Sequence, residues 1–171
     1  MSRAFVNEDH AAAQASEPVQ RRISEQPNYV TASGLAQLQS RVETLNAERR
    51  QLQAQGERAD KQRLADNESD LRYFTARVLS AQPVPTPTAH DKVQIGSRVT
   101  FADEHDHKQQ VRLVGEDEAD ATRGLINWGS PLGQALLGAA PGHEVLWKRP
   151  AGDLLIEVIA IDAGESTGSR A

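Results

Sequence analysis

Two heptad series separated by a single glycine constrain this chain more than any other feature of its sequence. The first series comprises Leu35, Leu38, Val42, Leu45, Arg49 and Leu52, and the second comprises Leu64, Asn67, Leu71, Phe74, Val78 and Ala81. Steps of three and four residues place such side chains along one side of a helix, where they bury against a partner helix. Gly56 tolerates the left-handed backbone just past a helix end, and Pro83 cannot continue a helix. The pattern predicts an antiparallel helical hairpin whose first helix spans about 32–55.

Polar residues mark the start of this hairpin and interrupt its seams. Thr31 and Ser33 are the candidate N-caps of the first helix. Arg49 and Asn67 occupy seam positions, where a polar side chain either fixes the register of two helices or reaches out to solvent. Both interpretations leave the predicted hairpin unchanged.

Beyond the hairpin the periodicity becomes that of strands. Alternating prolines at positions 83, 85 and 87 favour an extended connector. Five strands are then predicted, over residues 93–101, 109–115, 124–128, 144–149 and 153–161. Ser130 as the N-cap and Pro131 as the first helical residue open a short helix that stops at Gly138. Strands arranged around one short helix make a compact α+β domain.

These patterns divide the chain into five segments. We expect a disordered arm over 1–28, the hairpin over 29–82, a proline-rich linker over 83–91, the α+β domain over 92–163 and a flexible tail over 164–171. The arm is assigned because its polar composition and lack of periodicity offer too little apolar surface to offset the entropy lost on ordering. The tail is small and polar.

Composition excludes several classes of protein. The 171 residues contain no cysteine, which excludes a disulfide framework, a thiolate zinc site and a cysteine nucleophile. A formal net charge of -5 argues against general coating of nucleic acid, although a local basic face stays open. No run approaches the roughly 20 apolar residues of a membrane span. We therefore expect a cytoplasmic monomer that binds no membrane. No Ser/His/Asp arrangement or glycine-rich phosphate loop is discernible, so we do not expect a self-contained enzyme.

The second half of the chain carries the most specific motifs. Residues 111–120 read VRLVGEDEAD, residues 124–127 read GLIN and residues 130–138 read SPLGQALLG. This run resembles the C-terminal domain of the GreA/GreB family, in which a strand ending in Val-Gly and an acidic run precedes Ser-Pro-Leu/Met-x-x-Ala-Leu-Leu. In the first half, Tyr29-Val30-Thr31, Gly34 and Leu38 resemble the opening of that family's coiled coil. The resemblance spans about residues 29–162 and is stronger in the second half.

This resemblance implies a protruding coiled coil joined to an FK506-binding-protein-like antiparallel sheet domain with one short helix. It also implies a transcription elongation factor that docks this domain at the rim of the secondary channel of RNA polymerase. The residues that would contact the polymerase are Glu116, Asp117, Glu118, Asp120, Ser130, Pro131 and Leu132. Taken alone, the acidic run is ordinary soluble surface and Leu132 is a core residue at helical spacing.

At the predicted hairpin tip, Glu57 and Asp60 match the spacing of the family's two catalytic carboxylates. The resemblance implies that such acids help hold a magnesium ion of RNA polymerase, which activates water to cut a backtracked transcript. The protein would bring no cofactor of its own and would hold the metal only in that complex. Here the two acids are exchanged, the family's following Asn-Ala is missing, and each arm is about one heptad shorter, which retracts the tip by roughly 10 Å. Alternatively, the two acids complement the dipole of the second helix.

Two further groups of polar residues have alternative interpretations. Arg49, Arg50, Arg58 and Lys61 are candidates to face nascent RNA, as the family's basic hairpin face does, or they form a solvated flank with interleaved opposite charges. Residues 103–107 combine histidines and acids that suit divalent ions, but their position between two predicted strands favours a hairpin loop.

Three functions remain after this comparison. The first is an elongation factor that binds RNA polymerase, with or without stimulating transcript cleavage. The second is a non-cleaving regulator similar to the nucleoside diphosphate kinase regulator proteins, competing for the same polymerase site, which the shorter arms favour. The third is a peptidyl-prolyl isomerase, which follows from fold analogy alone and would need more aromatic residues than Phe101, Trp128 and Trp147 provide.

Overall fold

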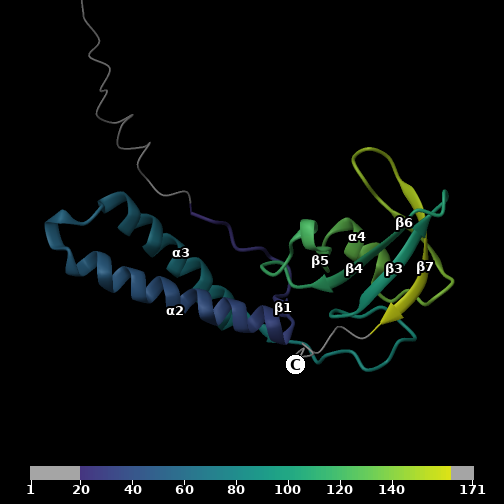
Figure 1. Cartoon of the computed structure of the whole chain (residues 1–171), viewed down its shortest axis with the longest axis horizontal. Helices are drawn as coiled ribbons and strands as arrows, with labels where there is room; N and C mark the ends of the chain where they lie inside the picture. Colours follow the sequence, from purple (N-terminus) through teal and green to yellow (C-terminus); the bar gives the residue numbers. More distant parts are fainter. Residues whose placement is uncertain (1–19, 163–171) are drawn as a thin grey trace, which may run out of the picture. The chain divides into compact units, whose positions relative to one another are not determined.

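The computed structural model describes residues 20–162 (Figure 1). These residues form two compact units, which we call the hairpin unit (20–24 and 39–79) and the sheet unit (25–38 and 80–162). Residues 25–38, assigned from sequence to the arm and the hairpin, thus group with the C-terminal half of the chain. The predicted arm before residue 20 and the predicted tail lie outside the described residues.

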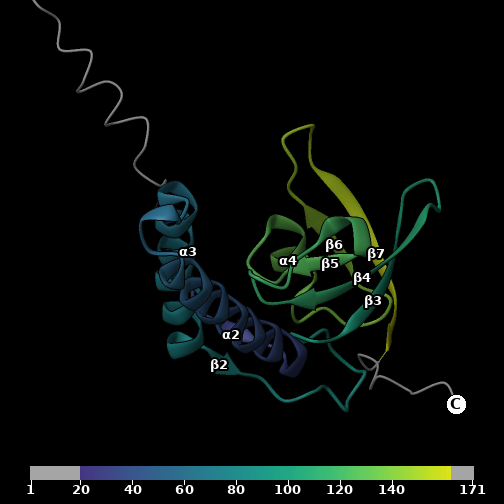
Figure 2. The same ribbon diagram turned by 60° about the vertical axis from the view of Figure 1, so that its left-hand side comes forward.

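The predicted helical hairpin is confirmed. Helix α2 (Ala32–Ala54) is followed by the 3-10 turn η1 (Gly56–Arg58) and helix α3 (Lys61–Ser80), and the two helices lie side by side in Figures 1 and 2. Thr31 is the N-cap of α2, since its Oγ1 accepts a bond from the Gly34 amide at 3.0 Å. Gly56 adopts a positive φ of 57° at the tip, where glycine relieves the strain.

The polar seam residues take different positions. Asn67 is 4% exposed and its Nδ2 donates across the hairpin to the Leu45 carbonyl at 3.0 Å and to Glu48 Oε2 at 3.3 Å. This bond fixes one helix against the other, as predicted for a polar seam residue. Arg49 is half-buried, and its Nε lacks a hydrogen-bond partner among the described residues.

Glu48 is the centre of the polar contacts between the two helices. Its Oε1 accepts bonds from Arg63 Nε at 2.9 Å and Arg63 Nη2 at 2.6 Å. The bonds from Arg63, followed by the bond from Asn67, hold the pKa of the Glu48 carboxyl below its ordinary value.

The sheet unit contains a five-stranded sheet in the order β5-β4-β3-β7-β6. Its elements are β3 (Arg98–Asp103), β4 (Lys108–Val114), η2 (Ala121–Arg123), β5 (Leu125–Asn127), α4 (Pro131–Leu136), β6 (Glu144–Trp147) and β7 (Leu154–Asp162). The α+β class is confirmed, and three of the four strand pairings in this sheet are antiparallel, whereas β5 pairs with β4 in parallel. Strand β3 begins later than the predicted residue 93, because Gly96 has a φ of 96° and its amide donates to the Leu113 carbonyl in a turn.

One core lies between α4 and the sheet. Leu136 of α4 is fully buried with Phe101, Leu113 and Val158 from three strands. The predicted helix start is confirmed, because Ser130 Oγ accepts a bond from the Gly133 amide at 3.2 Å. No helix of the described chain has the length and apolar character of a membrane span.

A short parallel ladder that the sequence did not predict joins β1 (Tyr29–Val30) to β2 (Gln82–Pro83) within the sheet unit. The Gln82 amide donates to the Asn28 carbonyl at 2.8 Å, and the Val84 amide donates to the Val30 carbonyl at 2.9 Å. Since alternate residues donate, the missing N–H of Pro83 costs no bond in this ladder.

We predict that the Glu48 carboxyl titrates below its ordinary value and that Arg63→Gln raises its pKa, as measured by side-chain NMR titration. Because the folded-state pKa is lowered, the stabilisation from this pair is present above the unfolded-state pKa and is lost as the pH falls through the folded-state pKa. Arg50→Gln, which removes an exposed charge from α2, the helix that carries Glu48, is the control. An unchanged Glu48 titration in the Arg63 variant would contradict the assignment.

Candidate functional site

The acidic loop that follows β4 has three acids at the surface and one, Glu118, that is buried. Glu116, Asp117 and Asp120 are partly exposed. Asp120 is the N-cap of η2, and its Oδ1 accepts bonds from the Thr122 hydroxyl at 2.6 Å and the Thr122 amide at 3.1 Å. The hydroxyl bond is the main cause that lowers the pKa of Asp120, so this carboxylate stays charged on the surface.

Glu118 instead points into the sheet unit, where it is 8% exposed. Its two carboxylate oxygens accept bonds from the Thr31 hydroxyl at 2.5 Å and the Ser33 hydroxyl at 2.6 Å, both at the start of α2. The closeness also explains Gly34, where a Cβ would lie 2.6 Å from Glu118 Oε2. Sequence reasoning treated Glu118 as one acid of a surface run, because nothing local signals partners more than 80 residues upstream.

The Ser-Pro-Leu segment at the start of α4 is only partly available to a partner. Ser130 Oγ is the cap of α4 and also donates to the Asn127 carbonyl at 2.7 Å. Leu132 is 6% exposed and belongs to the core. Pro131 is exposed, as is Leu137 at the other end of the helix.

At the hairpin tip, one turn carries both predicted carboxylates. Glu57 lies in η1 and Asp60 directly precedes α3, and both are exposed. Asp60 Oδ1 accepts a bond from the Arg63 amide at 3.1 Å, so this carboxylate caps α3. Arg58 and Lys61 are exposed on the same turn, which makes its charge mixed rather than acidic.

The other basic candidates lie further from the tip on α2. Arg50 is exposed, whereas Arg49 is half-buried in the hairpin unit. The four basic residues assigned to RNA therefore do not form one uniform surface.

The histidine-containing segment between β3 and β4 is a hairpin turn, as predicted. Asp103 Oδ1 accepts bonds from the amides of His105 at 2.8 Å and His107 at 3.0 Å. The His107 amide is the main cause that lowers the pKa of Asp103. Across the described residues, no group of three or more His, Cys, Asp or Glu side chains is arranged to hold a metal ion.

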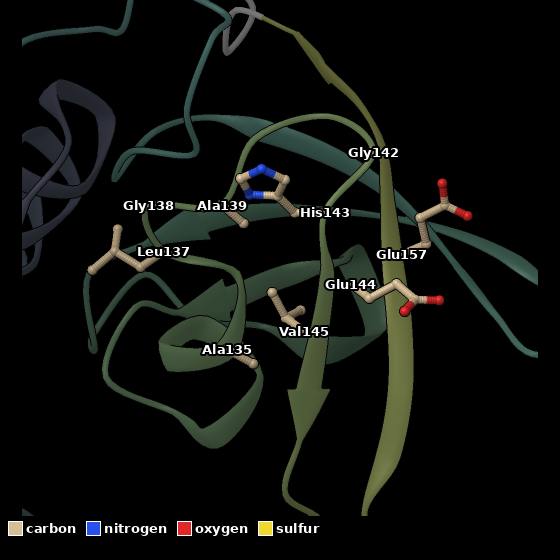
Figure 3. A pocket seen from close by; sticks show the side chains of 9 residues that line it. All are labelled: Ala135, Leu137, Gly138, Ala139, Gly142, His143, Glu144, Val145 and Glu157. Atoms are coloured by element: carbon tan, nitrogen blue, oxygen red, sulfur yellow. The ribbon is translucent and has the colours of Figure 1, made fainter.

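A shallow hollow of about 590 Å³ lies beside the end of α4 (Figure 3). Glu144 and Glu157 are register partners on β6 and β7, and Figure 3 shows both carboxylates pointing to one side, away from Leu137 and Val145. The nine residues that the structure describes around this hollow include no Phe, Tyr or Trp. Phe101 and Trp147 instead contact each other at a ring distance of 6.3 Å. The hollow gives no support to an isomerase.

Comparison with known proteins assigns the family. Residues 88–163 match the family model described as transcription elongation factor, GreA/GreB, C-terminal. The GreA of Nitratiruptor sp. is 30% identical over 153 residues, which cover 80% of this chain and 94% of that protein. The GreB of Neisseria meningitidis serogroup B is 28% identical over 156 residues, covering 81% of this chain and 96% of its own length. The chain belongs to the GreA/GreB family of transcription elongation factors.

Two further matches are more limited. The GreA of Novosphingobium aromaticivorans is 36% identical over 96 residues, or 56% of this chain and 61% of that protein. The crystal structure of GreA factor homolog 1 from Thermus thermophilus is 23% identical, covering 80% of this chain and 99% of that one, with a TM-score of 0.39.

The contact between Glu118 and α2 predicts a measurable coupling energy. Thr31→Val and Glu118→Gln should each destabilise the protein by about 1 to 2 kcal/mol in urea denaturation, because each removes a cap or a buried bond. The double variant should lose less than the sum of the two, since both changes remove one interaction. Glu104→Gln, at an exposed turn carboxylate, should leave stability unchanged. Additive losses would show that the two side chains do not interact.

Proposed function

We propose that this protein acts on RNA polymerase as a transcription elongation factor and binds at the secondary channel. The observation that carries the proposal is the alignment over 94% of a relative named transcription elongation factor GreA, which includes both the hairpin and the sheet unit. The protein would act in the cytoplasm as a monomer.

Docking is assigned to the accessible residues of the sheet unit. Glu116, Asp117 and Asp120 offer carboxylates at the surface, and Pro131 is exposed on the nearby helix start. Glu118, Ser130 and Leu132 would support this surface from beneath, since their side chains bond or pack inside the unit. An acidic docking surface fits a polymerase segment with basic side chains.

The assignment predicts that Glu116→Lys with Asp117→Lys weakens binding to core RNA polymerase at least 10-fold, because an attractive charge becomes repulsive. Affinity is measured by fluorescence anisotropy with the labelled full chain. Glu104→Lys in the β3–β4 turn with Glu144→Lys on β6 makes the same charge change at exposed sites, and this variant should bind normally. Equal losses in both pairs would mean that only net charge matters and would remove the docking assignment.

The hairpin tip is proposed to reach toward the polymerase active centre without supporting strong transcript cleavage. Magnesium needs oxygen ligands placed within a few tenths of an ångström, whereas arms shorter by one heptad withdraw the tip by roughly 10 Å. Glu57 and Asp60 have the carboxylate oxygens that would suit the polymerase magnesium, but Asp60 already caps α3. Arg50, Arg58 and Lys61 would face nascent RNA. The non-cleaving regulator therefore stays the competing form of the proposal.

A stalled, backtracked elongation complex tests this reading. The unmodified protein should shorten the transcript weakly or not at all, and Glu57→Gln with Asp60→Asn should change little. Asn replaces Asp60 because it keeps the helix cap while removing the charge. Both proteins should bind polymerase equally well. Robust cleavage that disappears in the double variant would show that the tip reaches the metal.

A further inference from the structure

The outer face of β3 and β4 carries a pair of arginines. Arg98 and Arg112 are register partners on these antiparallel strands. The Leu113 amide donates to the Ser97 carbonyl at 3.1 Å and the Arg112 amide donates away from β3, to Gly124, so Arg98 and Arg112 form a non-hydrogen-bonded pair. Side chains of such pairs lie closest, and like charges directly opposite destabilise a sheet.

A third arginine from another element joins this pair. Arg123 of η2 lines the same pocket, which has a volume of about 560 Å³ and is formed entirely by the sheet unit. We call it the arginine pocket and define it by Arg98, Arg112 and Arg123, with Ser33, Gln37 and Gln110 as polar neighbours. Arg112 is partly fixed there, since its Nε donates to the Gly96 carbonyl at 3.4 Å.

The charge of this pocket is opposite to that of the whole protein. The lining contains three arginines and one acid, Glu118, whereas the chain carries a formal net charge of -5. Both oxygens of Glu118 accept hydroxyl bonds from Thr31 and Ser33, so the carboxylate is held by the start of α2. A pocket with an excess of positive charge on a negative protein favours a small anion over a general polyanion surface.

We propose that the arginine pocket binds a nucleoside polyphosphate. Guanidinium groups match phosphate oxygens with two parallel bonds, which makes clustered arginines suited to this ligand. The volume exceeds that of a phosphate alone and lies within the usual range of small-molecule sites, about 300 to 1,000 Å³. Leu125, the register partner of Arg112, supplies an apolar wall for a base, and the amides of Gln37 and Gln110 can bond its edge or the sugar.

The test uses the full chain without polymerase and fluorescent ATP and GTP analogues as probes. The unmodified protein should bind one of them saturably, with an affinity that falls as salt rises. Arg112→Gln and Arg123→Gln should each weaken binding at least 5-fold, while Lys148→Gln, at an exposed lysine of the same unit, should not. Glu118→Gln, which removes the negative charge of the wall, should tighten binding.

Several results would overturn the proposal. No binding at millimolar nucleotide would do so, as would binding that neither arginine variant changes. Arg123 is exposed on a 3-10 turn, so its variant remains informative if the strand variant Arg112→Gln fails to fold by circular dichroism. Pyrophosphate that binds as tightly as the nucleotides would leave only a phosphate site. A short single-stranded RNA that displaces nucleotide with higher affinity would reassign the pocket to RNA.

Discussion

The carboxylate of Glu118 ties the start of α2 to the sheet unit, and much of the structure around it depends on that contact. Thr31 both caps the helix and donates its hydroxyl to Glu118, and Ser33 occupies the other carboxylate oxygen. Neighbouring backbone fits equally closely, because a Cβ at Gly115 would lie 2.5 Å from the Tyr29 carbonyl oxygen. Residues 25–38 therefore belong to a unit whose other residues begin at position 80.

Structure that local chemistry specifies could be predicted from the sequence. The Ser130 cap, the Pro131 start and the limits of the first hairpin helix depend on residues a few positions apart, and each was predicted closely. Pairings that join distant segments could not be predicted. The β1–β2 ladder has no sequence signal of its own, because each strand has two residues, and nothing in the strand predicted over 124–128 indicates that it pairs with β4 in parallel.

The candidate site shows the same limit at the level of single side chains. Charge runs are read as surface because ionised groups are costly to bury without partners. Glu118 meets that condition through the hydroxyls of Thr31 and Ser33, which lie more than 80 residues away, so no local pattern indicated its burial. Its three acidic neighbours are partly exposed. At the tip, Asp60 was foreseen both as a ligand and as a helix-terminal acid, and the bond to the Arg63 amide gives it the second role within the isolated chain.

The proline at the end of β2 has a further consequence. In the ladder with β1, the amides of Gln82 and Val84 are turned inward, so position 83 and position 85 face the opposite side, and both are prolines. That side of β2 consequently lacks the backbone N–H donors that a third strand would need for pairing. The prolines therefore prevent a third strand from extending this two-stranded ladder. A two-stranded ribbon with such an edge resists the strand exchange and edge-to-edge association to which short exposed strands are otherwise prone.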